Sequence, residues 1–203
     1  PKLRSQVISW SAKLTRIGVV ATFLPLLVAT RQRWPNSPGK YLEILQLCEK
    51  YAFRVYRLKR ARADAGRSTM YHAGYRLFHG EASFEEVCQN IKRSLRSRCN
   101  DDTFADIWRD DSGNWYEWRG LKYFLYEYEF HLASEKGASP LIEWTEIQDQ
   151  DLKDTIEHVL PRTIKGVSYW RDRFDRSAHS KHLHRLGNLS LTKHNSNYNN
   201  KPF

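Results

Sequence analysis

The strongest constraint on the fold is a three- and four-residue spacing of apolar side chains through most of the first 135 residues. Between residues 41 and 56 this spacing is continuous, and polar side chains such as Glu43 and Lys50 take the opposite face. Such a period predicts an amphipathic helix, because one helical turn takes 3.6 residues. Ser37 before Pro38 marks the start of this helix, since a proline in the first turn loses no hydrogen bond. We therefore expect a mainly α protein.

Two later segments repeat the helical pattern. Ser83 and Glu86 form a capping box, which predicts that a helix with one apolar face begins after Ser83. The same period recurs over residues 115–132, which we also expect to be helical. The sequence Gly-Ala-Ser-Pro at residues 137–140 ends this pattern, and only short apolar stretches follow. We therefore predict a helical domain over residues 1–150 and a small second domain over 151–203.

Charge, cysteine content and hydropathy narrow the function classes. The 33 Lys and Arg residues exceed the 23 Asp and Glu residues, and a net charge of +10 favours a polyanionic partner, above all nucleic acid. The three cysteines are odd in number and lack Cys-x-x-Cys spacing, so we expect no zinc site and a reducing compartment. The longest apolar run, residues 17–30, contains Pro25 and is shorter than the roughly 20 residues that span a bilayer. We therefore expect no membrane association.

The first segment with recognisable chemistry is residues 155–161, where Glu157 precedes His158 on a short apolar strand. Neighbouring side chains on a strand point to opposite faces. A bend at Pro161 would still let both reach one site. A carboxylate can hold a hard cation such as Mg²⁺, and a neutral imidazole can accept a proton from water near pH 7.

The second such segment is residues 184–192, in which Gly187-Asn188 predicts a tight turn. The Asn188 side chain can order this turn by bonding the backbone. A strand is expected at Leu189–Leu191. The asparagine-rich run after it can begin a helix, and its amide oxygens are candidate metal ligands.

The order of strand with histidine, loop with asparagine, strand, and helix with a ligand resembles the ββα-metal finger of HNH nucleases, the His-Me finger superfamily. The closer resemblance is to the C-terminal domain of GmrSD-type modification-dependent restriction endonucleases, including phosphorothioation-linked phage-defence nickases. In that family a helical region precedes an EH-I/V-LP strand, a basic stretch with a tryptophan, RLGNLTL, an asparagine at a helix start, and NKPF. The corresponding parts here are residues 157–161, Trp170, residues 185–191, Asn195 and residues 200–203.

This resemblance implies hydrolysis of DNA phosphodiester bonds by a nickase that uses one divalent metal, Mg²⁺ or Mn²⁺. Carried over by position, His158 is the general base and Asn188 orders the loop and orients His158. Glu157 and Asn195 are the implied metal ligands. A single site of this kind cuts one strand in each engagement, so nicking is the expected product.

Several assignments around these motifs have alternatives. The distance in sequence from Asn188 to Asn195 is slightly short for the family, which leaves His194 or Asn199 as alternative ligands. His182 and His184 are candidates for contact with phosphate or metal, or belong to a helix end or surface. The basic side chains near the motifs are candidate contacts to the DNA backbone. They are Arg162, Lys165, Arg171, Arg173, Lys181, Arg185 and Lys193.

Two further groups of side chains have no single interpretation. A basic run from Arg54 to Arg67 is a second DNA surface, a contact to another domain, or a solvated helix end. The aromatic residues Trp115, Tyr116 and Trp118 predict packing in the core or between domains, with a pocket for a modified base as the alternative.

The family also implies partners and a setting. The expected partners are phage or other foreign DNA and an N-terminal nucleotide-hydrolysing domain missing from this chain, which begins at Pro1. The expected location is the bacterial cytoplasm. The alternative functions are a non-catalytic DNA-binding module and an interaction module that regulates a partner NTPase domain.

Overall fold

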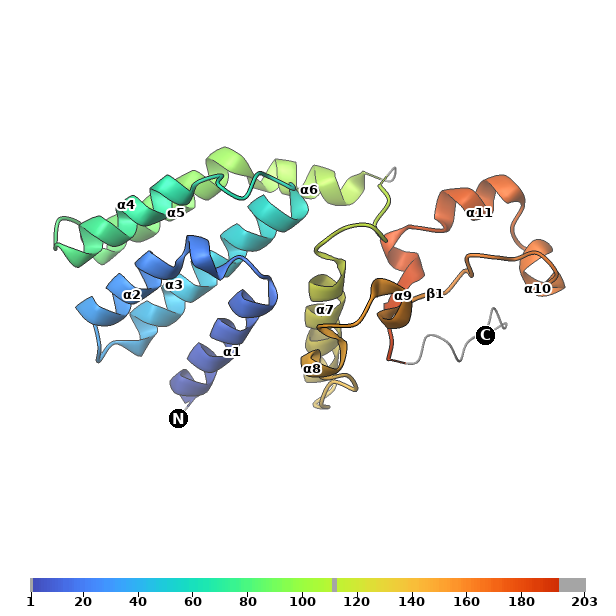
Figure 1. Cartoon of the computed structure of the whole chain (residues 1–203), viewed down its shortest axis with the longest axis horizontal. Coiled ribbons are helices and arrows are strands. Elements are labelled where there is room, and N and C mark those ends of the chain that lie inside the picture. Colours follow the sequence, from blue (N-terminus) through green and yellow to red (C-terminus); the bar gives the residue numbers. More distant parts are fainter. Residues whose placement is uncertain (1, 111–112, 194–203) are drawn as a thin grey trace. The chain divides into compact units, whose positions relative to one another are not determined.

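The structure is a computed structural model that describes residues 2–110 and 113–193 (Figure 1). The chain packs as two compact units, residues 1–110 (unit 1) and residues 111–203 (unit 2). Helices account for nearly all regular structure in the described residues, which confirms the prediction of a mainly α protein.

Unit 1 is built from helices that pack in pairs. Its elements are α1 (Lys2–Arg16), η1 (Val20–Thr22), α2 (Leu24–Arg33), α3 (Pro38–Tyr51), η2 (Ala52–Leu58), α4 (Arg67–Phe78), α5 (Phe84–Arg98) and α6 (Asp101–Arg109). The chain passes from α3 directly into η2, which is π-helical. Helix α2 packs on α4, α1 packs on α3, and α4 also contacts α5 (Figure 1).

Two predicted helix starts in unit 1 are confirmed. Helix α3 begins at Pro38, with Ser37 as its N-cap residue. The capping box is present at α5: the Ser83 hydroxyl accepts a hydrogen bond from the Glu86 N–H at 3.1 Å, and the Glu86 carboxylate accepts one from the Ser83 N–H at 2.7 Å. These bonds satisfy two of the backbone donors that a helix N-terminus leaves free.

Close packing of α2 on α4 depends on Gly74. A Cβ atom at Gly74 would lie 2.9 Å from the backbone nitrogen of Leu26, closer than real Cβ contacts allow. The side chain of Leu26 is itself completely buried. The two helices can therefore approach this closely only because residue 74 has no side chain.

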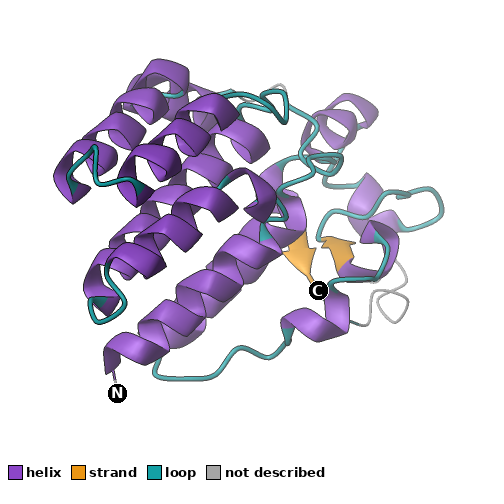
Figure 2. Ribbon diagram, turned by 60° about the vertical axis from the view of Figure 1, so that its left-hand side comes forward, coloured by secondary structure: helices purple, strands orange, loops and turns teal. Residues whose placement is uncertain are grey.

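Unit 2 combines one long helix with short elements and a small sheet. Its elements are α7 (Leu121–Glu135), α8 (Trp144–Ile147), α9 (Leu152–Thr155), β1 (Ile156–His158), α10 (Ser168–Arg171), α11 (Arg176–His182), η3 (Leu186–Asn188) and β2 (Leu189–Leu191). The two strands, drawn in orange in Figure 2, pair antiparallel, and His158 lies opposite Leu189. Both strands occur where the sequence predicts them.

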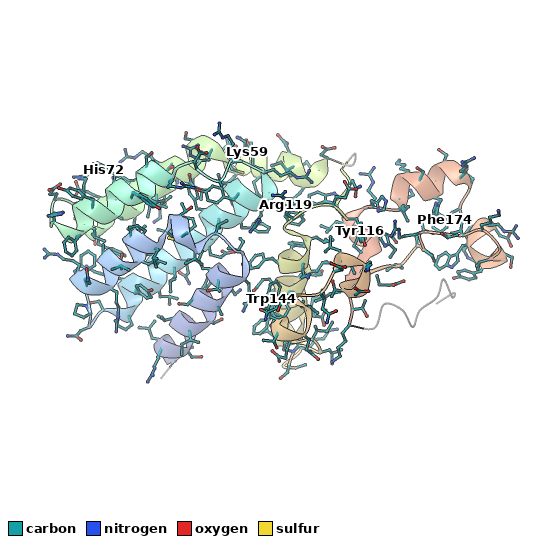
Figure 3. All side chains as sticks on the ribbon, viewed as in Figure 1. Lys59, His72, Tyr116, Arg119, Trp144 and Phe174 are labelled. Carbon is teal, nitrogen blue, oxygen red and sulfur yellow. The ribbon has the colours of Figure 1, made fainter. Side chains whose placement is uncertain are left out.

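One hydrophobic cluster of unit 2 joins α7, α8 and the sheet. Tyr126, Ile142 and Ile147 are buried together, and Trp144 and Leu191 pack against them. Trp144 is labelled in Figure 3. Because α7 and α8 share this cluster with the sheet, the compact unit begins after residue 110. The sequence motifs favour a boundary after residue 150. The assignment of residues 151–203 to a separate finger stays a prediction.

The prediction of a helix over residues 115–132 is wrong at its start. Helix α7 begins only at Leu121, and residues 115–120 form turns. The indole of Trp118 lies against Gly120, where a Cβ would come within 2.4 Å of the ring. The buried Trp118 ring thus occupies the space beside Gly120. Among the described residues, none of the helices is long and apolar enough to cross a membrane.

Candidate active site

His158 is the last residue of β1 and is buried, with 5% of its surface exposed. Strand alternation places Ile156 and His158 on one face and the half-buried Glu157 on the other. The strand ends here because the chain bends toward Pro161 and no longer pairs with β2. His158 is therefore held by sheet pairing on one side and by the following loop on the other.

Asn188 ties the loop after β1 to the turn before β2. Its side-chain oxygen accepts a hydrogen bond from the N–H of Leu160 at 2.5 Å. Its amide nitrogen donates to the carbonyl oxygens of Leu160 at 3.1 Å and Leu183 at 2.8 Å. The Asn188 carbonyl also accepts from the N–H of Val159 at 3.0 Å. These bonds hold the backbone directly after His158, which is the geometry that a loop organiser needs.

His184 lies beside His158, although it is 26 residues away in sequence. Nδ1 of His184 is 3.2 Å from Nε2 of His158, and the two rings are close to perpendicular, at 72°. The N–H of Trp115 donates to the His184 carbonyl at 3.0 Å and fixes the backbone at this position. The sequence did not assign a role to His184. No known motif spacing links this residue to β1, because α10 and α11 lie between them in the chain.

Tyr116, which is labelled in Figure 3, completes an aromatic layer over the two histidines. Its ring centroid is 4.7 Å from that of His158 and 5.7 Å from that of His184, with which it is stacked at 26°. The Arg162 guanidinium lies 5.7 Å from the Tyr116 ring centroid, within the range of a cation–π contact. The prediction that Tyr116 packs in a core or between domains therefore missed its position beside His158.

The surroundings of both imidazoles disfavour their protonated forms. Burial, followed by nearby His184 and Arg162, lowers the pKa of His158 from 6.5 to about 4. Burial and Arg162 also lower the pKa of His184, while Glu117 opposes this effect. A neutral imidazole at a bent strand end can accept a proton from a water molecule.

Glu157 is the one predicted metal ligand that the described residues contain. Burial raises its pKa, because the charged carboxylate is disfavoured away from water. A cation beside it would offset that cost, so this carboxylate fits a divalent metal. Residues 2–110 and 113–193 contain no group of three His, Cys, Asp or Glu side chains placed to hold a metal. Asn195 and its alternatives His194 and Asn199 lie outside the described residues.

The predicted DNA contacts fall into different surroundings. Arg162 is exposed and is the one that contacts the aromatic layer over His158. Lys165, Arg171 and Lys181 are exposed on the segments around α10 and α11. These positions leave their charges accessible to solvent and to phosphate.

The other three predicted DNA contacts already bond within unit 2. Arg173 lies over the Tyr169 ring at 3.8 Å and donates to the Tyr169 carbonyl. Arg185 is half-buried and donates to the Lys181 carbonyl at 3.0 Å. The Lys193 ammonium pairs with Glu146 at 3.1 Å.

The two histidines of α11, His179 and His182, have different surroundings. The Nε2 atom of His179 is 2.8 Å from the carbonyl oxygen of Pro161, so this ring links α11 to the loop that follows β1. His182 is exposed at the end of the helix. The sequence contains no signal that separates these two residues from His184.

The basic run from Arg54 to Arg67 lies in unit 1, and two of its arginines contact other residues of that unit. Arg54 pairs with Asp101 at 2.5 Å, and the Arg57 side chain donates to the carbonyl oxygen of Ile17 at 2.8 Å. These bonds favour a structural role for the two arginines over a solvated helix end.

Comparison with known proteins identifies one family. The family model described as "GmrSD restriction endonucleases, C-terminal domain" matches residues 99–203. The matched stretch contains β1, β2 and every residue of the site described above. No curated protein and no solved structure matches the chain.

Proposed function

The chain belongs to the GmrSD restriction endonuclease family through its C-terminal domain, and we propose that it is a metal-dependent DNA nickase of the HNH type in bacterial restriction or anti-phage defence. Membership of the family implies restriction-endonuclease-like cleavage of DNA. The proposal adds the metal, the general base, the finger over residues 151–203 and the cutting of one strand at a time.

The observation that carries the proposal is the state of His158. Its imidazole lies at a strand end whose following loop is bonded to Asn188, and burial lowers its pKa to about 4, which disfavours the protonated form. The exposed, positively charged Arg162 lies on the same aromatic layer. A neutral base beside a cation that can attract phosphate is what hydrolysis of a phosphodiester requires.

In the proposed reaction, His158 accepts a proton from a water molecule while the water oxygen forms a bond to phosphorus. The bond between phosphorus and the 3′ oxygen breaks, and the leaving oxygen takes a proton from solvent. Arg162 binds a non-bridging phosphate oxygen, and Asn188 holds the backbone that carries His158. Glu157 with Asn195 would hold Mg²⁺ or Mn²⁺, which when bound supplies charge stabilisation at the phosphorane and the leaving oxygen.

A single site of this type engages one strand, so double-strand breaks would require two sites or two copies. The proposed partners are phage or other foreign DNA and a nucleotide-hydrolysing domain on the N-terminal side. Such a domain would control when the nuclease acts on DNA.

The test is conversion of supercoiled plasmid to open circles in Mg²⁺, Mn²⁺ or EDTA. We expect cleavage by the wild type in the presence of metal, none in EDTA, and a loss of about 10²- to 10⁴-fold in His158→Ala. The matched control is His131→Ala, because His131 is an exposed histidine on α7 and its removal should leave cleavage unchanged.

Three results would contradict the proposal. Cleavage that persists in His158→Ala would exclude His158 as the base. Plasmid that is shifted on a gel but stays supercoiled with every metal would favour the non-catalytic DNA-binding module, and a protein that does neither would favour the interaction module.

A further inference from the structure

His184 is the one side chain that directly contacts a ring nitrogen of His158 among the bonds described above. From this contact we infer that His184 is a positioning residue: it accepts a hydrogen bond from Nε2 of His158 and leaves Nδ1 of His158 as the proton-accepting atom. The inference rests on the proposed function and deepens it by naming the reacting nitrogen.

A neutral imidazole can donate one hydrogen bond and accept one through its ring nitrogens. Such a ring has one N–H and one lone pair. At 3.2 Å, either Nε2 of His158 donates to Nδ1 of His184 or the reverse holds. If His184 donated, the lone pair of His158 would be occupied and Nδ1 would carry the hydrogen, so His158 would have no nitrogen left to act as a base. Only donation from His158 to His184 is compatible with catalysis.

His184 is held in place independently of His158. Its carbonyl accepts from the Trp115 N–H, and its ring stacks on Tyr116. The preceding residue, Leu183, is bonded through its carbonyl to the side chain of Asn188. Backbone and ring contacts therefore fix the direction of the His184 Nδ1 atom, as an orienting partner must be fixed to select one tautomer.

The bond between the two rings changes once the proton has been transferred. When Nδ1 of His158 has accepted the proton from water, both ring nitrogens carry hydrogen and the Nε2–H donates to the lone pair of His184. The bond becomes charge-assisted at that moment and therefore strengthens. His184 itself gains no proton. This is the relation between a base and its orienting partner that is known from catalytic triads.

The direct test is the tautomer of His158 in the full chain labelled with ¹⁵N-histidine, read from long-range ¹H–¹⁵N correlation spectra in EDTA. We expect the Nε2–H form in the wild type. In His184→Phe, which keeps a ring against Tyr116 but has no acceptor, a signal of the Nδ1–H form should appear. His184→Asn, whose amide oxygen can replace Nδ1 as acceptor, should restore the wild-type spectrum.

His182→Ala is the matched control, since His182 is exposed at the end of α11. It should leave the His158 signals unchanged. An Nδ1–H form of His158 in the wild type, or a spectrum that His184→Phe does not alter, would overturn the inference.

The second readout is kinetic. We expect His184→Phe to lower kcat for plasmid nicking about 10- to 100-fold with little change in KM, because the group positions the base and does not bind DNA. His184→Asn should recover most of the rate. Equal rates in the wild type and His184→Phe would refute the role of His184 even if His158→Ala is inactive. If the wild type does not cleave DNA at all, the proposed function fails, and the spectra still decide whether His184 sets the tautomer.

Discussion

Unit 1 and unit 2 reach stable structures by different means. In unit 1 the longest helices, α1 and α5, have 15 residues each, and α5 buries one apolar face. Within residues 113–193 of unit 2, only α7 has this length, and α8, α9 and α10 have four residues each. A hydrophobic cluster around α7 and α8 is supplemented there by bonds from side chains to the backbone of the loops.

Two side chains illustrate this second mode of stabilisation. Asn188 makes three such bonds around the loop after β1. The Lys122 ammonium donates to the carbonyl oxygens of Ile147 and Gln150, both at 2.7 Å, and so holds the C-terminal end of α8. The candidate site therefore lies where irregular backbone is held by a few polar groups, and single substitutions should act there through lost hydrogen bonds and not through cavities.

The largest loss of stability is expected from a substitution that opens a cavity in unit 1. Leu26→Ala removes a fully buried side chain between α2 and α4, which should cost about 2–5 kcal/mol of the free energy of unfolding. Urea unfolding measures the loss, and hydrogen exchange should locate it in peptides from residues 2–110. Val28→Ala, at a position that is 47% exposed on the same helix, is the control. Equal acceleration of exchange in peptides from 113–193 would show that the units unfold in one step.

The next largest effect is expected from Asn188→Ala in unit 2. The substitution leaves the buried N–H and carbonyl of Leu160 without these partners, at a cost of about 2–3 kcal/mol. Hydrogen exchange should accelerate around β1 and β2, and nicking should be lost with it. Ser190→Ala, at an exposed position of β2, should change neither quantity. If the Asn188→Ala protein were as stable as the wild type, the bonds of Asn188 would not be what stabilises this part of unit 2.

A smaller loss of stability is expected when the pH is lowered from 7 to 5. Burial lowers the pKa of His158 to about 4, below its ordinary 6.5 in an unfolded chain. Between these values the unfolded chain binds a proton that the folded protein does not, so stability falls as the pH falls from 7 to 5. In EDTA, the wild type should lose about 1–2 kcal/mol more than His158→Gln over this interval. Urea titrations at both pH values measure the difference, and identical losses in the two proteins would contradict it.

The smallest effect is expected at a helix cap in unit 1. Ser83→Ala removes the hydroxyl that accepts the Glu86 N–H, which should lower the free energy of unfolding by about 1 kcal/mol. Ser97→Ala, in an exposed position near the end of the same helix, should stay within about 0.5 kcal/mol of the wild type. Thermal unfolding of both variants compares the two sites. A loss as large as that in Asn188→Ala would mean that unit 1 also depends on single polar groups.

Local patterns were sufficient to predict much of the fold. The apolar period predicts α3, the capping box predicts where α5 begins, and the two short apolar segments become β1 and β2. The start of α7 was mispredicted because Trp115 and Tyr116 fit a helical period equally well. In the structure the Trp118 ring lies against Gly120, and the helix begins only after this contact.

By itself, the sequence determined the helical character of the chain, the positions of both strands and the resemblance carried by the motifs around His158 and Asn188. All of these depend on residues that are close together in the chain. Only the tertiary structure brought Tyr116, His184 and Arg162 together around His158. The physical reason is that such contacts join residues separated by whole helices and turns, and their distances depend on how the backbone between them is packed and bonded.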